Sequence, residues 1–183
     1  MKKVILFSIF FLFLFGCSEQ ETNPVAEPEN SPMLRGGNSA SSGCDYLVTA
    51  TVNSSGSEWT YFITRTKPSA KDLSHFTIDL NNCGSESASF SNILSATVNG
   101  SPANLTASEG SGTGCNPLEV TNNFVKFDNL QSASSWVLVI NYNRGYSVGN
   151  VAGWIKAGNS CNQVVIPGPT CPTDNPANKL ISE

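Results

Sequence analysis

Charged side chains are scarce in this chain: they make up 13% of its 183 residues, and 14 acidic residues outnumber 10 basic ones. Nucleic acids and anionic lipid surfaces attract clusters of lysine and arginine. A sparse charge with a net value of −4 therefore argues against both of these partners. The abundance of serine, threonine, asparagine and glycine is instead typical of a secreted β-protein.

Catalytic signatures are also missing. The chain has one histidine, His75, at the expected start of a strand, where a hydrogen-bonded structural role is more usual than acid–base chemistry. No Gly-x-Ser-x-Gly elbow surrounds a serine. The carboxylates are scattered, and strand spacing brings no pair of them together for glycoside hydrolysis. We therefore expect a protein that is not an enzyme.

Metal and cofactor sites have equally little support. No paired C-x-x-C spacing indicates zinc. Calcium could be held by Asp72, Asp79 or Asp128, but the acidic D-x-D-x-D-G loop is absent. The glycine-rich stretch Gly110–Gly114 lacks the lysine and helix of a phosphate loop, so it predicts a hairpin loop. We expect neither a metal nor a cofactor.

What the chain does have is the layout of a secretory signal peptide: a positive start, an apolar run and small residues. The apolar run Val4–Phe15 has 12 residues, whereas a membrane-spanning helix needs about 20. The run ends in Leu14–Cys17, which resembles the lipobox of bacterial lipoproteins. The resemblance implies that residues 1–16 are removed and that a diacylglyceryl group is attached to the Cys17 thiol. An ordinary signal peptide is the alternative.

Residues 17–43 are expected to form a lipid-anchored flexible linker, because they contain several prolines and glycines and few large apolar side chains. Without residues 1–16 the chain has 8 basic and 14 acidic residues, a net charge of −6. The acidic residues after Cys17 resemble the surface-export signals of Bacteroidota-type lipoproteins, although a solvated linker explains them equally well. The resemblance implies an outer-membrane lipoprotein that is exposed at the cell surface.

Residues 44–172 are expected to fold as one all-β domain, an antiparallel β-sandwich of Ig-like or jelly-roll-like type, followed by a polar tail over 173–183. Short alternating runs separated by turn residues predict about eight strands, and no helical period or crossover helix is visible. The expected strands are Tyr46–Val52, Trp59–Thr64, Leu73–Leu80, Phe90–Val98, Phe124–Phe127, Trp136–Tyr142, Val151–Ala157 and Gln163–Ile166.

Three local patterns refine this prediction. The pair Asn99-Gly100 predicts a tight hairpin turn, because both positions accept positive φ. The continuous apolar run within Trp136–Tyr142 predicts a central strand that is covered on both faces. Pro167 and Pro169 are expected to end strand pairing.

Five cysteines remain when Cys17 is assigned to lipid, and an odd number outside the cytoplasm suggests two disulfides and one spare thiol. Their spacing does not select the pairs. They are Cys44, Cys83, Cys115, Cys161 and Cys171.

Two segments resemble a domain type of secreted bacterial surface proteins. The first is Asp72–His75, followed by a strand that ends at Cys83. The second is Lys156–Gly158, followed by a strand and Gly168–Cys171. The resemblance implies a small, disulfide-stabilised extracellular β-domain in which Cys83 pairs with Cys171.

With that pair assigned, Cys44–Cys115 is the expected second disulfide, and Cys161 is spare. The alternative is a local disulfide between Cys161 and Cys171 around the final strand.

Surface aromatic residues would matter for function, because sugars stack on exposed rings. The three tryptophans Trp59, Trp136 and Trp154 are mostly core candidates. Tyr146 is expected to lie outside the core, and with Arg144 and Trp154 it forms the candidate ligand-binding set.

These observations predict a non-catalytic cell-envelope lipoprotein that presents a β-sandwich for protein interaction, adhesion or a structural role. The alternative is a surface lipoprotein that binds glycans through exposed aromatic residues. The expected partners are the membrane, through the lipid anchor, and a protein or glycan ligand.

Overall fold

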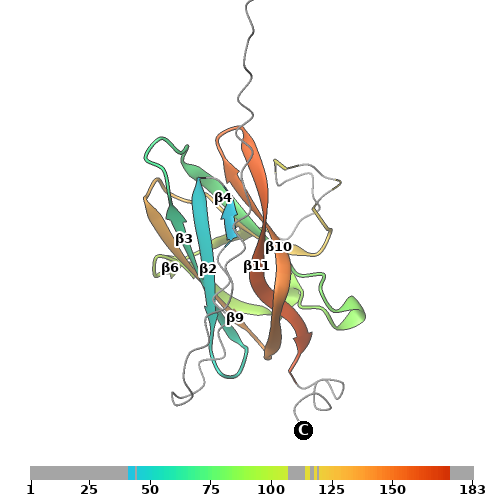
Figure 1. The fold of residues 1–183 in the computed structure, drawn as a ribbon. Helices are drawn as coiled ribbons and strands as arrows, with labels where there is room; N and C mark the ends of the chain where they lie inside the picture. The colour runs from blue at the N-terminus through green and yellow to red at the C-terminus, as the bar shows by residue number, and fades with distance from the viewer. Residues whose placement is uncertain (1–40, 44, 107–113, 116–117, 119, 174–183) are drawn as a thin grey trace, which may run out of the picture. The chain divides into compact units, whose positions relative to one another are not determined.

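The computed structural model describes residues 41–43, 45–106, 114–115, 118 and 120–173. Within them two antiparallel sheets pack face to face, as the all-β prediction requires (Figure 1). The expected signal peptide over 1–16, the lipidation site Cys17 and Cys44 lie outside the described residues. The sandwich begins at Ser41, so the last three residues of the expected linker form its first strand.

One sheet has six strands in the order β1-β2-β3-β9-β5-β6, and the other has five in the order β11-β10-β4-β8-β7. Every expected strand segment contributes to these sheets, and β1, β6 and β7 are additional. The bounds are β1 Ser41–Gly43, β2 Tyr46–Val52, β3 Glu58–Arg65, β4 Leu73–Asp79, β5 Ile93–Val98, β6 Ser101–Pro102, β7 Asn104–Thr106, β8 Phe124–Asp128, β9 Ser135–Tyr142, β10 Tyr146–Ala157 and β11 Ser160–Pro172.

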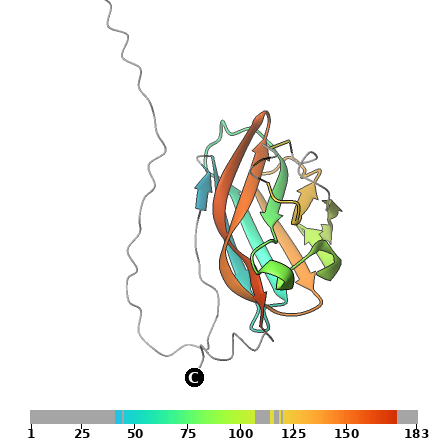
Figure 2. The same cartoon turned by 90° about the vertical axis from the view of Figure 1, so that its right-hand side faces the viewer.

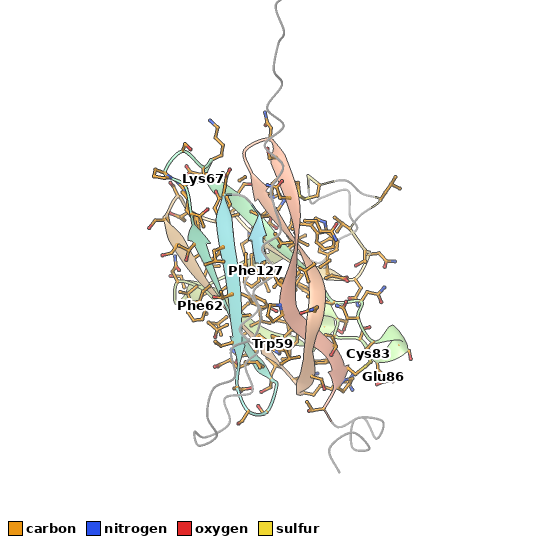
Figure 3. The ribbon with its side chains drawn as sticks, in the orientation of Figure 1. Trp59, Phe62, Lys67, Cys83, Glu86 and Phe127 are labelled. Atoms are coloured by element: carbon orange, nitrogen blue, oxygen red, sulfur yellow. A yellow bond between two sulfur atoms is a disulfide. The ribbon has the colours of Figure 1, made fainter. Side chains whose placement is uncertain are left out.

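The core lies between the sheets and follows the alternation of the sequence. On β3 the inward residues Trp59, Tyr61 and Ile63 are fully buried. Phe62, which points outward between Tyr61 and Ile63, is 39% exposed. Tyr61 meets Phe76 of the opposite sheet, with ring centroids 6.2 Å apart. Figure 3 labels two fully buried core residues, Trp59 of β3 and Phe127 of β8. Burying a large apolar side chain stabilises the fold by about 1.5–3 kcal/mol. The paired inner faces therefore hold the two sheets together.

Strand β9 is central in its sheet but is covered on one face, so the expectation of two covered faces is wrong. Trp136, Leu138 and Ile140 point into the core, whereas Val137 is 36% exposed and Val139 is half-buried. Valine is favoured in strands whichever face it occupies. The unbroken apolar run in β9 therefore has two possible readings: a strand buried on both faces, or a strand with one buried face and valines on its exposed face.

The hairpin of β10 and β11 is the longest pairing in the described residues (Figure 2). Strand β11 continues through Pro167 and Pro169, which lie opposite Asn150 and Val148 of β10, so the expected stop is wrong. Strand β11 lies at the end of its sheet, and among the described strands β10 is its only paired neighbour. Proline is tolerated in such an edge strand when its missing N–H would face away from the neighbour.

The turn predicted at Asn99-Gly100 forms, and a second turn joins β2 to β3. Asn99 and Gly100 have φ values of 50° and 80° and connect β5 to β6, as an Asn-Gly hairpin requires. In the β2–β3 turn the side-chain oxygen of Asn53 accepts hydrogen bonds from the backbone N–H groups of Ser57 and Glu58, at 3.0 and 3.2 Å. Both turns therefore join neighbouring strands of the six-stranded sheet.

Two short 3₁₀ helices, η1 Gly84–Glu86 and η2 Phe90–Asn92, precede β5. The expected strand over Phe90–Val98 therefore begins three residues later. Ser89 explains this difference, because its backbone N–H donates to the Asn92 side chain at 2.9 Å and closes a helical turn. In the described part of the chain, no helix is long and apolar enough to cross a membrane.

Candidate functional site

Two disulfide bonds join cysteines among the described residues. Cys83 is bonded to Cys171, the pair that the resemblance implied, with Cα atoms 5.0 Å apart. Cys115 is bonded to Cys161, with Cα atoms 5.3 Å apart. The expected Cys44–Cys115 pair, the spare Cys161 and the alternative Cys161–Cys171 bond are therefore all wrong. Cys44 lies outside the described residues.

The Cys115–Cys161 bond holds part of the β7–β8 connection against the outer face of the five-stranded sheet. There Val120, Phe124 and Trp154 form a small apolar cluster of their own, against which both cysteines pack. Trp154 is 1% exposed, and its indole N–H has no hydrogen-bond partner among the described residues. Its expected role in ligand binding is therefore wrong, because the β7–β8 connection covers the ring.

Tyr146 is also buried, contrary to the expectation that it lies outside the core. It is 1% exposed, and its ring meets that of Tyr142 edge-on with centroids 5.3 Å apart. The Arg144 guanidinium lies over the Tyr146 ring at 5.4 Å. Strand β10 begins at Tyr146 and turns this residue inward, whereas Trp154 belongs to the outer cluster. The structure brings Arg144 and Tyr146 together but places Trp154 apart from them.

His75 and Asp72 have structural surroundings. His75 is half-buried on β4, opposite Lys156 of β10. Asp72 accepts hydrogen bonds from Arg65 and Ser132. The hydrogen bond from Arg65, then that from Ser132, lowers the pKa of the Asp72 carboxyl below its usual value. This carboxylate joins the end of β3 to the segment before β9.

The other two acidic candidates are engaged as well. Asp79 accepts a hydrogen bond of 2.6 Å from Thr121. Asp128 pairs with Lys126 at 2.9 Å and accepts a hydrogen bond from Thr106. Among the described residues, no group of three or more histidine, cysteine, aspartate or glutamate side chains could hold a metal ion.

A cleft of about 510 Å³ lies where the β5–β6 hairpin of one sheet approaches β7 and the β8–β9 connection of the other. Its exposed polar residues are uncharged. They are Asn99, Ser101, Asn104, Asn129 and Gln131.

The inner wall of the cleft is apolar and firmly held. It includes Leu130 and Trp136, which are 7% and 1% exposed. The Trp136 indole N–H donates to the backbone oxygen of Gln131 at 2.9 Å. Asn99 at the rim accepts a hydrogen bond of 2.8 Å from the backbone N–H of Val137. These hydrogen bonds therefore tie the β5–β6 turn and the β8–β9 connection to strand β9.

Sequence reasoning missed this cleft. Asn99-Gly100 is an ordinary turn signal, and nothing in the sequence indicates that this turn lies near Asn129, which follows β8. The available signal was that Asn99 and Asn129 suit positive φ, and their φ values are 50° and 55°.

Two buried tyrosines predict how the fold responds to alkali. Burial, and then the neighbouring Tyr142, raises the pKa of Tyr61 well above its usual value, and burial chiefly raises that of Tyr142. The unfolded phenols ionise near pH 10, so the stability contributed by the neutral phenols is complete below that pH and is lost above it. We expect these two rings to ionise only as the protein unfolds, when phenolate absorbance and circular dichroism are followed together. Ionisation of all four tyrosines before unfolding would contradict this.

Fold and bonding together define the class of this chain: a disulfide-stabilised antiparallel β-sandwich with a polar cleft at one edge. No family model and no curated protein matches the sequence. The chain is similar to a solved structure of BslA, described as a bacterial hydrophobin, with 15% identity and a TM-score of 0.36. The match covers 67% of this chain and 94% of BslA. A likeness at this level carries no functional argument.

Proposed function

We propose that this chain is a non-catalytic cell-envelope lipoprotein, anchored through Cys17 in the outer membrane, that presents its β-sandwich for interaction with another protein. The lipobox resemblance of Leu14–Cys17 supports the anchor. The bonds Cys83–Cys171 and Cys115–Cys161 support a position outside the cytoplasm, because structural disulfides persist in oxidising compartments.

The observation that carries the interaction role is the outer face of the six-stranded sheet. Phe62 and Val137 are direct cross-strand partners on this face and are 39% and 36% exposed. Uncharged residues in register surround them on four strands. We define the outer sheet face as Thr49, Thr51, Thr60, Phe62, Thr97, Val137 and Val139. The exposed carboxylate of Glu58 lies just beyond it, one outward position from Thr60 on β3.

The composition of this face indicates the kind of partner. A flat surface with an apolar centre and a threonine rim resembles the core and rim of a protein interface. A partner that brought a charged group onto it would lose hydration without gaining an opposite charge. We therefore infer a protein partner whose own contact surface is uncharged.

Site-specific photo-crosslinking in the full-length protein tests this function. A photo-reactive amino acid replaces Phe62, and a matched one replaces Val165, which is 55% exposed on β11 of the other sheet. We expect a discrete adduct with an envelope protein from position 62 and none from position 165. Radiolabelled palmitate should enter the same protein and be lost in Cys17→Ser, together with the adduct.

Two results would count against the proposal. Equal adducts from positions 62 and 165 would mean that the outer sheet face has no preferred partner. Palmitate retained in Cys17→Ser would place the lipid elsewhere and remove the anchor.

A further inference from the structure

We propose that the cleft between the β5–β6 hairpin and the β8–β9 connection is a binding site for an uncharged saccharide. The cleft lies at the edge where β6 and β7 meet, apart from the outer sheet face. This inference therefore goes beyond the protein interaction proposed above and does not depend on it.

Side-chain amides supply the polar chemistry of the cleft. Asn99 and Asn104 reach it from the β5–β6 turn and from β7, and Asn129 and Gln131 reach it from the β8–β9 connection. An amide offers an acceptor oxygen and two donor hydrogens side by side. Neighbouring hydroxyls of a sugar both donate and accept, so they match such groups. Ser101 adds a hydroxyl of its own.

The charges at the cleft exclude an anionic or cationic ligand. Among the described residues that line it, none is basic, so a phosphate or carboxylate would find no counter-charge. The single carboxylate, Asp128, is already paired with Lys126 at 2.9 Å and bonded to Thr106. A cation would have to displace Lys126, which is itself buried. An uncharged ligand meets neither obstacle.

The apolar wall suits the carbon-bound hydrogens of a sugar ring. Pro102, Ala103 and Leu130 line the cleft beside the amides, and Trp136 also lines it. The volume of about 510 Å³ falls within the range of roughly 300–1,000 Å³ that is usual for small-ligand sites. The cleft therefore offers both polar and apolar contact in a space of suitable size.

The recognition groups are held in place before any ligand arrives. The left-handed backbone at Asn99 and Asn129, which asparagine tolerates better than most residues, fixes where each side chain leaves its turn. Asn99 is bonded to Val137, and the Gln131 backbone is bonded to Trp136. Binding therefore orders few additional groups, which favours affinity.

An extended peptide is the competing ligand, and the edge strands argue against it. Peptides that add to a sheet need a run of free backbone N–H and C=O groups. Here β6 has two residues and β7 has three, and Pro102 in β6 has no N–H. Recognition at this edge must therefore come from side chains, which favours a saccharide.

The test uses the full chain and an array of neutral oligosaccharides, including glucan, mannan, xylan and N-acetylglucosamine oligomers, with polyuronates and uncharged peptides as comparison probes. We expect a neutral oligosaccharide to bind and to shift the indole N–H signal of Trp136 in NMR spectra. Asn129→Gly combined with Gln131→Ala should weaken binding by roughly tenfold or more, since two hydrogen-bonding amides are lost.

Asn129→Gly removes the amide but keeps the positive φ, so the turn is preserved. Gln163→Ala, at an exposed amide on β11, is the matched control and should leave affinity unchanged. An array without neutral hits, a hit unaffected by the cleft variants, or tighter binding of polyuronates or peptides would each overturn the proposal. The position-62 adduct should persist in the cleft variants, so failure here is distinguishable from failure of the interaction role.

Discussion

Replacing both Cys83 and Cys171 with alanine is expected to lower the free energy of unfolding by about 4–5 kcal/mol, because the bond closes a long loop in the unfolded chain. The two residues are 88 positions apart, and they join the start of η1 to the end of β11. Urea unfolding of the variant and the native protein at the same pH measures the difference. A midpoint that does not move would contradict the expectation.

The second disulfide provides a comparison within the same protein. Cys115 and Cys161 are 46 positions apart, so the chain-entropy model gives a similar stabilisation of about 4 kcal/mol. Its loss should have a distinct local effect, because this bond packs against the apolar cluster in which Trp154 is buried with Val120 and Phe124. We expect a red-shifted tryptophan fluorescence in the folded Cys115→Ala/Cys161→Ala variant, and no such shift in the Cys83→Ala/Cys171→Ala variant.

Replacing Gly56 with alanine is expected to destabilise the fold by about 4 kcal/mol or to prevent folding. Losses of this size arise from a few mechanisms, among them overpacking and backbone strain. Gly56 has φ +74°, and a Cβ atom there would lie 2.4 Å from the backbone oxygen of Tyr146. The Gly56 carbonyl also accepts hydrogen bonds from Trp59 and from the Tyr146 backbone, both at 2.9 Å. Any movement that relieves the clash disturbs these bonds, and thermal unfolding measures the loss.

Gly100→Ala is the matched control for Gly56→Ala. Gly100 has φ +80°, yet nothing lies within 4 Å of a Cβ atom placed there. This variant therefore isolates the left-handed backbone, which costs an alanine about 1–2 kcal/mol. Equal losses from the two variants would show that the contact with Tyr146 is not what makes Gly56 necessary.

The strands that sequence predicted well are those whose burial alternates. Tyr46–Val52 and Trp59–Thr64 both alternate, and the structure confirms them as β2 and most of β3. The predicted turn at Asn99-Gly100 is also confirmed, because its signal is the local preference of two residues for positive φ. Local rules succeeded where the cause of the structure is local.

The failures have long-range causes. The Cys115–Cys161 bond depends on Cys115 and Val120 packing beside Trp154 on the outer face of a sheet, which spacing does not encode. The expectation that Tyr146 lies outside the core rests on its place in the Arg144-Gly145-Tyr146 turn. Tyr146 instead begins β10, and the pairing of β10 with β11 turns the ring inward. The cleft arises where β6 and β7, too short to show any period, bring two turns together.

The Cys83–Cys171 bond also determines how the protein transmits mechanical load. All the residues that line the cleft, from Val98 to Trp136, lie inside the covalent loop that this bond closes. A pull on the two ends of the chain would pass directly across the sulfur atoms and leave that loop without tension. Strands β1, β2, β3 and β4 all precede Cys83 and lie outside the loop. A protein tethered at one end in flowing medium would thus be able to lose these four strands to shear while the loop that contains the cleft could not be drawn out.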